Sequence, residues 1–162
     1  MSRKPVIWSL VMASLFWVRG WGQENASAAC TFADGKQMSV RYEAAPATEK
    51  LHEGRVWSPG KSPIFLFTSA PLKMGDAAIP IGAYSMYVIP GKKNWTMVVN
   101  KNVAQNGKYD ERQDVARAPM QSGSLSQPSK QVEIYLGHVA PKQCSLRLYY
   151  GTTGTWIEFM EQ

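Results

Sequence analysis

Short runs of alternating apolar and polar residues are the feature of this 162-residue chain that most limits its fold. The clearest pair lies between Ala83 and Lys101, where two such runs flank the turn residues Pro90 and Gly91. Side chains alternate between the two faces of a strand, so each run offers one apolar face. Pro90 lacks a backbone N–H and Gly91 tolerates positive φ, which favours a chain reversal. The stretch therefore predicts a β-hairpin.

Similar runs recur through the rest of the chain, and no segment shows helical spacing over the length that a helix needs. A second hairpin is predicted across 31–42, around the turn pair Asp34-Gly35. Three segments break the pattern: 109–116 predicts one helical turn, 121–128 an exposed loop, and 151–154 a turn. Further strands are expected at 56–57, 64–68 (a compact apolar run, predicted to be buried), 72–74, 77–80, 132–136, 146–150 and 156–159.

Short strands separated by turns are typical of sandwiches and barrels. We therefore predict an all-β, single-domain, antiparallel β-sandwich, with a barrel-like variant as the alternative. Its expected core residues are Tyr84, Met86, Val88, Trp95, Met97, Val99, Ile134, Leu146 and Leu148.

The N-terminus has the three parts of a secretory signal peptide: basic Arg3 and Lys4, an uncharged apolar run over 6–18, and a small-residue site that ends at Ala28. We expect a signal peptide at 1–28, a β domain at 29–162, and a periplasmic or secreted location. The apolar run is shorter than the ~20 residues of a membrane span. We therefore expect no membrane span after cleavage, with an uncleaved anchor as the alternative.

Charge indicates no nucleic-acid partner. After cleavage the chain would keep 15 basic and 11 acidic residues, a net charge of +4. These residues are scattered, whereas nucleic-acid binding requires a basic stripe or patch. The mild positive charge is better interpreted as a solubility feature.

The two cysteines, Cys30 and Cys144, both lie in the part that is expected to be exported. In an oxidising compartment such a pair predicts a disulfide. The alternative is a redox-active or metal-binding thiol pair, but the wide separation does not match a Cys-x-x-Cys motif.

The densest group of charges is the one candidate for acid–base chemistry. Asp110 and Asp114 are four residues apart, and Arg117 follows. With His138 or His52 they could form a hydrolase site, provided that a cleft shifts their pKa values. The alternative is a solvated face, or an Asp–Arg pair that fixes a loop.

Other catalytic and cofactor signals are absent from the sequence. The two histidines are not at metal-ligand spacing, no Gly-x-Ser-x-Gly elbow occurs, and no glycine-rich phosphate loop is present. We therefore expect neither metal nor cofactor, and the residues favour a non-catalytic protein over an enzyme.

Aromatic side chains offer surfaces on which a sugar or another flat ligand could stack. Alternation along the strands should turn about half of them toward the core. The candidates are Tyr84, Tyr87, Trp95, Tyr149, Tyr150 and Trp156.

The segment LKMGDAAIPIGAYSMYVIPGKKNWTMVVNKN, followed by YDERQDVAR, resembles the bacterial domain-of-unknown-function family 2911 (DUF2911). Members show Pro-x-Gly-x-Tyr-Ser, Ile-Pro-Gly-Lys and Trp-Thr motifs, and a Gly-x-Val-Trp-x-x-Gly element upstream. The matching residues are Gly54, Val56, Trp57, Gly60, Pro80, Gly82, Tyr84, Ser85, Ile89, Pro90, Gly91, Lys92, Trp95, Thr96, Asn100, Tyr109, Asp110, Asp114 and Arg117.

The resemblance implies an exported, periplasmic bacterial protein and supplies no reaction. Trp57, Tyr109, Asp114 and Arg117 lie in the matching elements and are our candidate binding residues. One departure concerns Ser58, which follows Trp57 where many members have Arg. If that element forms a site in the family, the site is altered here.

Three functions remain open from the sequence. The leading hypothesis is a non-catalytic module of the cell envelope that binds a small ligand, a glycan or a partner protein. The second is a hydrolase that uses Asp110, Asp114 and Arg117 with a histidine. The third is a structural or assembly protein, which would require an exposed apolar patch or an unpaired sheet edge.

Overall fold

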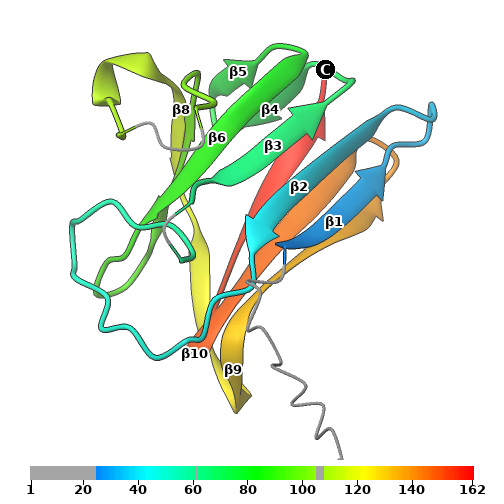
Figure 1. Cartoon of the computed structure of the whole chain (residues 1–162). Helices are drawn as coiled ribbons and strands as arrows, with labels where there is room; N and C mark the ends of the chain where they lie inside the picture. The colour runs from blue at the N-terminus through cyan, green and yellow to red at the C-terminus, as the bar shows by residue number, and fades with distance from the viewer. Residues whose placement is uncertain (1–24, 61, 105–107) are drawn as a thin grey trace, which may run out of the picture.

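The protein consists of two antiparallel β-sheets that face each other (Figure 1). The computed structural model describes residues 25–60, 62–104 and 108–162. The sheets have the strand orders β1-β2-β3-β6-β7-β8 and β5-β4-β10-β9. The elements are β1 Asn25–Thr31, β2 Gln37–Glu43, β3 Ile64–Thr68, β4 Leu72–Met74, β5 Ala77–Ile79, β6 Gly82–Ile89, β7 Thr96–Asn100, the 3₁₀ turn η1 Glu111–Gln113, β8 Asp114–Pro119, β9 Gln121–Ala140 and β10 Gln143–Glu161.

This architecture confirms the predicted all-β sandwich. In the described residues η1 is the single helical element. The two sheets remain separate there, so the barrel-like variant is not formed. β1 lies next to β9 and β8 lies next to β5, which places both long edges of the first sheet against the second.

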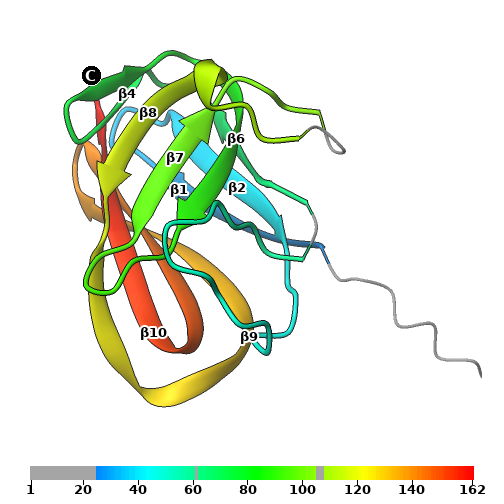
Figure 2. The ribbon, with the colours of Figure 1, turned by 90° about the vertical axis from the view of Figure 1, so that its left-hand side faces the viewer.

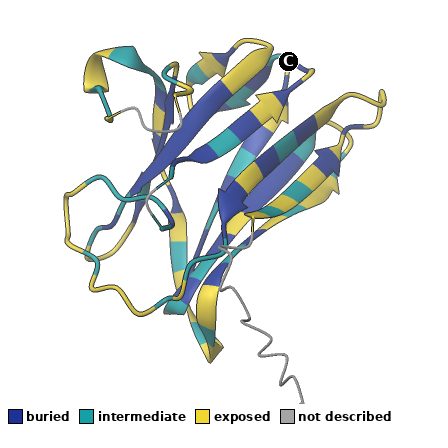
Figure 3. Cartoon of the chain, viewed as in Figure 1, coloured by how far each residue is buried: buried dark blue, intermediate teal, exposed yellow. Residues whose placement is uncertain are grey.

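The core lies between the sheets, and alternation along the strands decides which side chains enter it. Buried and exposed residues alternate along β2 and β3 (Figure 3). In the central hairpin Val88 pairs with Met97, and both are fully buried. All nine predicted core residues are buried, including Trp95 just before β7. The predicted central hairpin is therefore confirmed as β6 and β7.

Cys30 of β1 and Cys144 of β10 form a disulfide across the two sheets, with their Cα atoms 6.2 Å apart. This confirms the pairing that the sequence predicted. Because Cys30 lies on an edge strand and Cys144 on an inner strand of the other sheet, the bond ties the first sheet's edge to the second sheet.

β1 is longer than predicted at its N-terminal end. It begins at Asn25, which pairs with Glu43, so the predicted cleavage point after Ala28 falls inside a strand. Most of the predicted signal peptide, residues 1–24, lies outside the described residues. Within the described part of the chain, no helix has the length and hydrophobicity that a membrane crossing requires.

Two of the predicted breaks are strands in the structure. Residues 121–128 belong to β9, because Thr153–Trp156 of β10 pair with Gln121–Ser124. Residues 151–154 lie inside β10, and the turn of this hairpin is at Pro141-Lys142 instead. Gly151 sits between two register shifts with a positive φ of 54°, so its glycine marks a bulge and not a hairpin end.

The predicted helical turn at 109–116 is shorter than expected. Only Glu111–Gln113 is helical, and Asp110 is its N-cap, with its side chain accepting from the Arg112 amide. β8 begins immediately afterwards at Asp114, which pairs with Asn100.

Removing the disulfide should destabilise the protein strongly. The bond joins residues separated by 114 positions, and closing a loop of this size lowers the entropy of the unfolded chain. The double substitution Cys30→Ala/Cys144→Ala should therefore lower the free energy of unfolding by up to about 4.7 kcal/mol, measured by urea denaturation. Reductant should destabilise the wild type to the same level and leave the variant unchanged. If reductant does not change the urea midpoint of the wild type, the disulfide does not stabilise the protein as we expect.

Candidate functional site

Tyr109, Asp114, Arg117 and Asn100 form one hydrogen-bonded group at the β8 edge of the first sheet, which we term the Asp114 cluster. The Tyr109 hydroxyl donates to Asp114 Oδ2 over 2.7 Å, and Arg117 Nε donates to the same oxygen over 2.6 Å. Asn100 Nδ2 donates to Asp114 Oδ1 over 2.7 Å. The structure therefore brings three of the four candidate binding residues together.

The local fold explains why these side chains meet. Asn100 is fully buried and also donates to the Asp110 carbonyl over 2.8 Å, which holds the start of η1 against β7. A register shift between Val99 and Asn100 then places Asp114 opposite Asn100. The Tyr109 ring packs edge-on against Tyr87 of β6 with 5.0 Å between ring centroids.

The environment of the cluster changes two pKa values. Burial, reinforced by the hydrogen bond to Asp114, raises the pKa of Tyr109 to about 12. Hydrogen bonds from the side chains of Arg112 and Gln113 lower the pKa of Asp110 to about 2. At neutral pH the Tyr109 phenol is therefore protonated and the Asp110 carboxylate is charged.

Chemically, the Asp114 cluster is a closed arrangement. Both Asp114 oxygens accept hydrogen bonds from protein donors, and Arg117 also pairs with Glu111 over 3.2 Å. A carboxylate whose oxygens are both engaged is poorly placed to accept a proton from a substrate. The geometry matches the alternative of an Asp–Arg pair that fixes a loop.

The structure does not bring a histidine to this cluster. His138 lies on β9 of the other sheet, opposite Cys144. His52 lies in the segment between β2 and β3, where its carbonyl accepts from the Arg55 amide. Among the described residues, neither histidine is hydrogen-bonded to Asp110, Asp114 or Arg117.

Trp57, the fourth candidate binding residue, belongs to a different group. Its backbone pairs with Val88, and its ring packs edge-on against Trp95 and Tyr150, with centroids 6.4 and 5.1 Å away. The indole Nε1 donates to Glu49 Oε2 over 3.3 Å. Trp57 therefore joins the segment between β2 and β3 to residues of both sheets.

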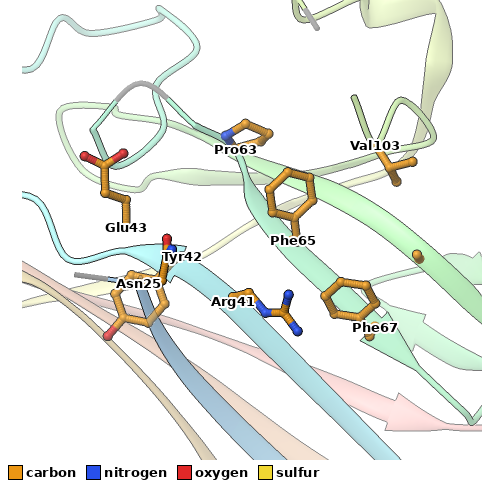
Figure 4. Close-up of a pocket in the computed structure, with 9 residues that line it drawn as sticks. Asn25, Arg41, Tyr42, Glu43, Pro63, Phe65, Phe67 and Val103 are labelled. Atoms are coloured by element: carbon orange, nitrogen blue, oxygen red, sulfur yellow. The ribbon is translucent and has the colours of Figure 1, made fainter. Parts of the chain in front are cut away.

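A hollow of about 360 Å³ on the outer face of the first sheet was not predicted, and we term it the Arg41 hollow (Figure 4). Phe65 and Phe67 of β3 lie beside Arg41 of β2, and the Arg41 guanidinium carbon lies 5.4 Å from the centre of the Phe67 ring. Pro63, Ala83 and Val103 complete its apolar lining. A neighbouring hollow shares Arg41 and Phe67 with it and is also lined by Ser27 and Ser39.

This hollow corrects the expectation that 64–68 is buried throughout. Ile64 and Leu66 are fully buried, whereas Phe65 is half-buried and Phe67 is 39% exposed. The only signal in the sequence was the presence of two phenylalanines at alternate positions, on the opposite face from Ile64 and Leu66.

The Arg41 hollow and the Asp114 cluster share one face of the sheet. Their residues stand opposite one another in register, from Arg41 through Phe65, Ser85 and Asn100 to Asp114. Residues that follow β7 fold back over this row. Thus Ser85 Oγ donates to the Asn102 carbonyl over 2.6 Å, and the Asn102 amide donates to Asn100 Oδ1 over 2.9 Å.

These bonds give the cluster a structural consequence. The residue after Asn102 is Val103, which is 46% exposed and forms one wall of the Arg41 hollow. The Asp114 cluster, through Asn100, thus helps to hold that wall in place.

The aromatic candidates divide between core and surface, as alternation predicted. Tyr84, Trp95 and Tyr150 belong to the core. Tyr87 is buried outside the core against Tyr109, and Tyr149 and Trp156 are half-buried. The last two line a hollow on the second sheet. In the described chain no group of three or more His, Cys, Asp or Glu side chains is arranged to hold a metal ion.

A family model described as "Protein of unknown function (DUF2911)" matches residues 25–159. The chain belongs to this family. Comparisons with curated proteins and with solved structures give no match. The family match begins at the first residue of β1 and ends within β10, so it spans both sheets of the sandwich.

Several DUF2911 motif residues make contacts that hold the fold. In the Pro-x-Gly-x-Tyr-Ser motif, the Tyr84 hydroxyl donates to the Pro80 carbonyl over 2.8 Å. In the Gly-x-Val-Trp-x-x-Gly element, the Gly54 amide donates to the Pro90 carbonyl over 2.9 Å. Gly60, with φ +63°, lies against the buried Glu43 carboxylate. These positions are explained by folding alone.

Substituting Gly60 tests the last contact. A Cβ at Gly60 would lie 2.2 Å from Glu43 Cδ, so Gly60→Ala must displace a buried carboxylate. Gly54→Ala is the matched control, because Gly54 also has a positive φ of 72° but nothing within 4 Å. Backbone strain should reduce stability by about 1–2 kcal/mol in both, and Gly60→Ala should lose a further ~1–3 kcal/mol. Equal urea midpoints for the two variants would contradict the contact.

The raised pKa of Tyr109 predicts a delayed alkaline titration. The folded protein favours the neutral phenol, so this contribution to stability is present below pH ~10 and is lost as the pH rises through about 12. The pKa values of Tyr84, Tyr135 and Tyr150 are also raised. Ultraviolet titration of tyrosinate should therefore show one more late-ionising group in the wild type than in Tyr109→Phe. A Tyr109 that ionises near its ordinary pKa would show that the hydroxyl is neither buried nor held by Asp114.

Proposed function

We propose that this protein is an exported, non-catalytic binding module, and that its ligand is a small, largely apolar molecule carrying an anionic group. The main observation behind this proposal is that the Arg41 side chain is exposed and has no acidic partner in the part of the chain that the structure describes. Its exposed guanidinium lies over the Phe67 ring and makes no salt bridge with any described residue. A cation presented among aromatic rings without a carboxylate partner suits an anion supplied by a ligand.

The electrostatics of the hollow support this choice. The planar guanidinium can donate two parallel hydrogen bonds to a carboxylate, and it does so more strongly where apolar neighbours exclude water. The carboxylate of Glu43, the other charged group in the lining, lies beside Gly60. In Figure 4 the Glu43 carboxylate points away from the phenylalanines, whereas the Arg41 guanidinium points toward Phe67.

The remaining lining supports an apolar body for the ligand. Phe65, Phe67, Pro63 and Val103 offer carbon surface, and a volume of about 360 Å³ is at the lower end of the range for small-molecule pockets. A flat ring carrying one carboxylate would place its ring between the phenylalanines and its charge at Arg41.

Binding rather than catalysis is supported by where the reactive side chains lie. The Asp114 carboxylate is held by three donors, and the two histidines belong to other parts of the fold. Among the described residues that line the Arg41 hollow, Glu43 is the only carboxylate and there is no histidine.

Two features support export to the periplasm or the cell exterior. A disulfide that joins the two sheets is typical of oxidising compartments. The first 28 residues have the charge and hydropathy pattern of a signal peptide.

A pair of probes of nearly the same shape tests the role of Arg41. Indole-3-acetate carries a carboxylate, whereas indole-3-acetamide is neutral. The wild type should bind the acid about tenfold more tightly than the amide, because one charge-assisted contact contributes at least ~1.4 kcal/mol. Isothermal titration calorimetry measures both affinities.

Arg41→Gln should abolish this preference while leaving amide binding nearly unchanged. Arg55→Gln is the matched control, because Arg55 is an exposed arginine in the segment between β2 and β3 that lines neither the Arg41 hollow nor the hollow at Tyr149 and Trp156. Equal affinity of the wild type for acid and amide, absence of binding of both probes, or an unchanged preference in Arg41→Gln would each contradict the proposal.

A further inference from the structure

The hairpin of β9 and β10 carries a separate hollow, of about 450 Å³, on the outer face of the second sheet. The pairing register of β10 with β9 shifts on both sides of Gly151. β9 also curves sharply between its yellow and orange parts (Figure 2). The hollow takes residues from both sides of these shifts: Arg147 and Tyr149 before them, Trp156 and Glu158 after them. We term it the Trp156 hollow. It shares no lining residue with the Arg41 hollow.

Two glycines form the floor of the Trp156 hollow, and aromatic rings lie directly on them. Gly123 and Gly154 pair opposite each other in the hairpin. A Cβ at Gly123 would lie 3.6 Å from the Trp156 ring, and a Cβ at Gly154 would lie 2.9 Å from Leu125 Cδ2 and 3.4 Å from the Tyr149 ring. Each ring therefore rests against backbone that carries no side chain.

Both rings are fixed before any ligand arrives. The Trp156 Nε1 donates to Gln121 Oε1 over 2.9 Å, which sets the orientation of the indole. The Tyr149 ring packs against Tyr135 with 5.4 Å between centroids. Rings that are already ordered lose little conformational entropy when a ligand stacks on them, which favours binding.

The charged groups of the hollow are one donor and one acceptor. Arg147 is exposed and has no salt bridge among residues 25–60, 62–104 and 108–162. Glu158 Oε2 is buried and has no hydrogen-bond donor among the same residues. A buried carboxylate oxygen without a donor is unfavourable, so a side-chain movement that uncovers Glu158 Oε2 to a ligand hydroxyl in the hollow would relieve that deficit.

This combination selects the chemistry of the ligand. A purely apolar ligand would leave Arg147 and Glu158 without partners, and a phosphorylated ligand would meet the Glu158 carboxylate as a like charge. A pyranose ring has an apolar face of C–H groups that stacks on aromatic rings. It also has hydroxyls at its edge that both donate and accept.

A further hollow of about 220 Å³ shares Trp156 and Glu158 with the Trp156 hollow. Ala118 and Pro119 of β8 form part of its lining, so the recess continues from the hairpin to the edge of the other sheet. Two recesses joined at one indole suit a ligand with more than one ring.

We propose that the outer face of the β9–β10 hairpin binds a β-1,4-linked oligosaccharide, whose flat, extended chain lays successive pyranose rings on Tyr149 and Trp156. This site is separate from the Arg41 hollow and does not depend on it. Either site can fail its test without affecting the other.

The test follows the Trp156 indole N–H by NMR in the wild-type protein during titration with cellotetraose, chitotetraose and maltotetraose. Trp57 and Trp95 pack against each other, so their indole signals serve as internal controls. We expect a saturable shift of the Trp156 signal with cellotetraose or chitotetraose at roughly millimolar concentrations. Maltotetraose, whose α-linkages curve the chain, should bind at least about tenfold more weakly.

Three variants complete the test. Tyr149→Ala should weaken saccharide binding at least about tenfold, because aromatic side chains dominate such contacts. Glu158→Gln changes the side chain least and should weaken binding at least about threefold through the lost charge on the acceptor. Arg41→Gln should leave saccharide binding unchanged. The Trp57 and Trp95 signals report whether each variant is folded, and Glu158→Gln remains informative if Tyr149→Ala is not.

Three results would overturn the proposal. The first is no shift of Trp156 with either β-linked saccharide. The second is equal affinity for maltotetraose. The third is unchanged affinity in folded Tyr149→Ala and Glu158→Gln.

Discussion

Met86, Val88 and Met97 of the first sheet are packed into one core with Leu146 and Leu148 of the second, and the rest of the structure depends on this contact. All five side chains are fully buried. Fixing these inward positions also fixes which residues face outward, because neighbours along a strand point to opposite faces. The side chains that we propose bind ligands are therefore exposed because of the same alternation that places the core residues inside.

Outward side chains of the first sheet fall into two kinds of arrangement. In the Asp114 cluster donors and acceptors match, and both oxygens of the carboxylate are engaged. In the Arg41 hollow the guanidinium has an aromatic neighbour but makes no salt bridge to a carboxylate of the described residues. A matched group stabilises the fold, whereas an unmatched charge beside apolar surface is available to a ligand. Because the two share one row of the sheet, the matched group also supports the wall at Val103.

The sequence was most informative where one face of a strand is buried. The central hairpin, the disulfide and the core followed from alternation and from cysteine count. The prediction from the sequence was wrong at residues 121–128, because a segment rich in Ser, Gln and Gly is typical of a loop. The pairing of this segment with Thr153–Trp156 comes from the partner strand and not from the segment itself.

The candidate site was predicted only in part. Tyr109, Asp114 and Arg117 were identified because they lie in elements that resemble DUF2911 motifs, and they do meet in space. Arg41 and Phe65 were missed because they are far apart in sequence and become neighbours only through the pairing of β2 with β3. A five-residue apolar strand such as β3 gives no sign by itself that one of its faces is uncovered.

A backbone-amide NMR map of the whole chain against a mixed collection of small acids and oligosaccharides tests the central claim most directly. The claim is that ligands bind the unmatched outer faces and not the Asp114 cluster. We predict shifts concentrated at Arg41, Phe65 and Phe67 for the acids, and at Tyr149–Trp156 for the oligosaccharides. Shifts centred on Asp114 and Arg117, with both hollows unaffected, would contradict the account.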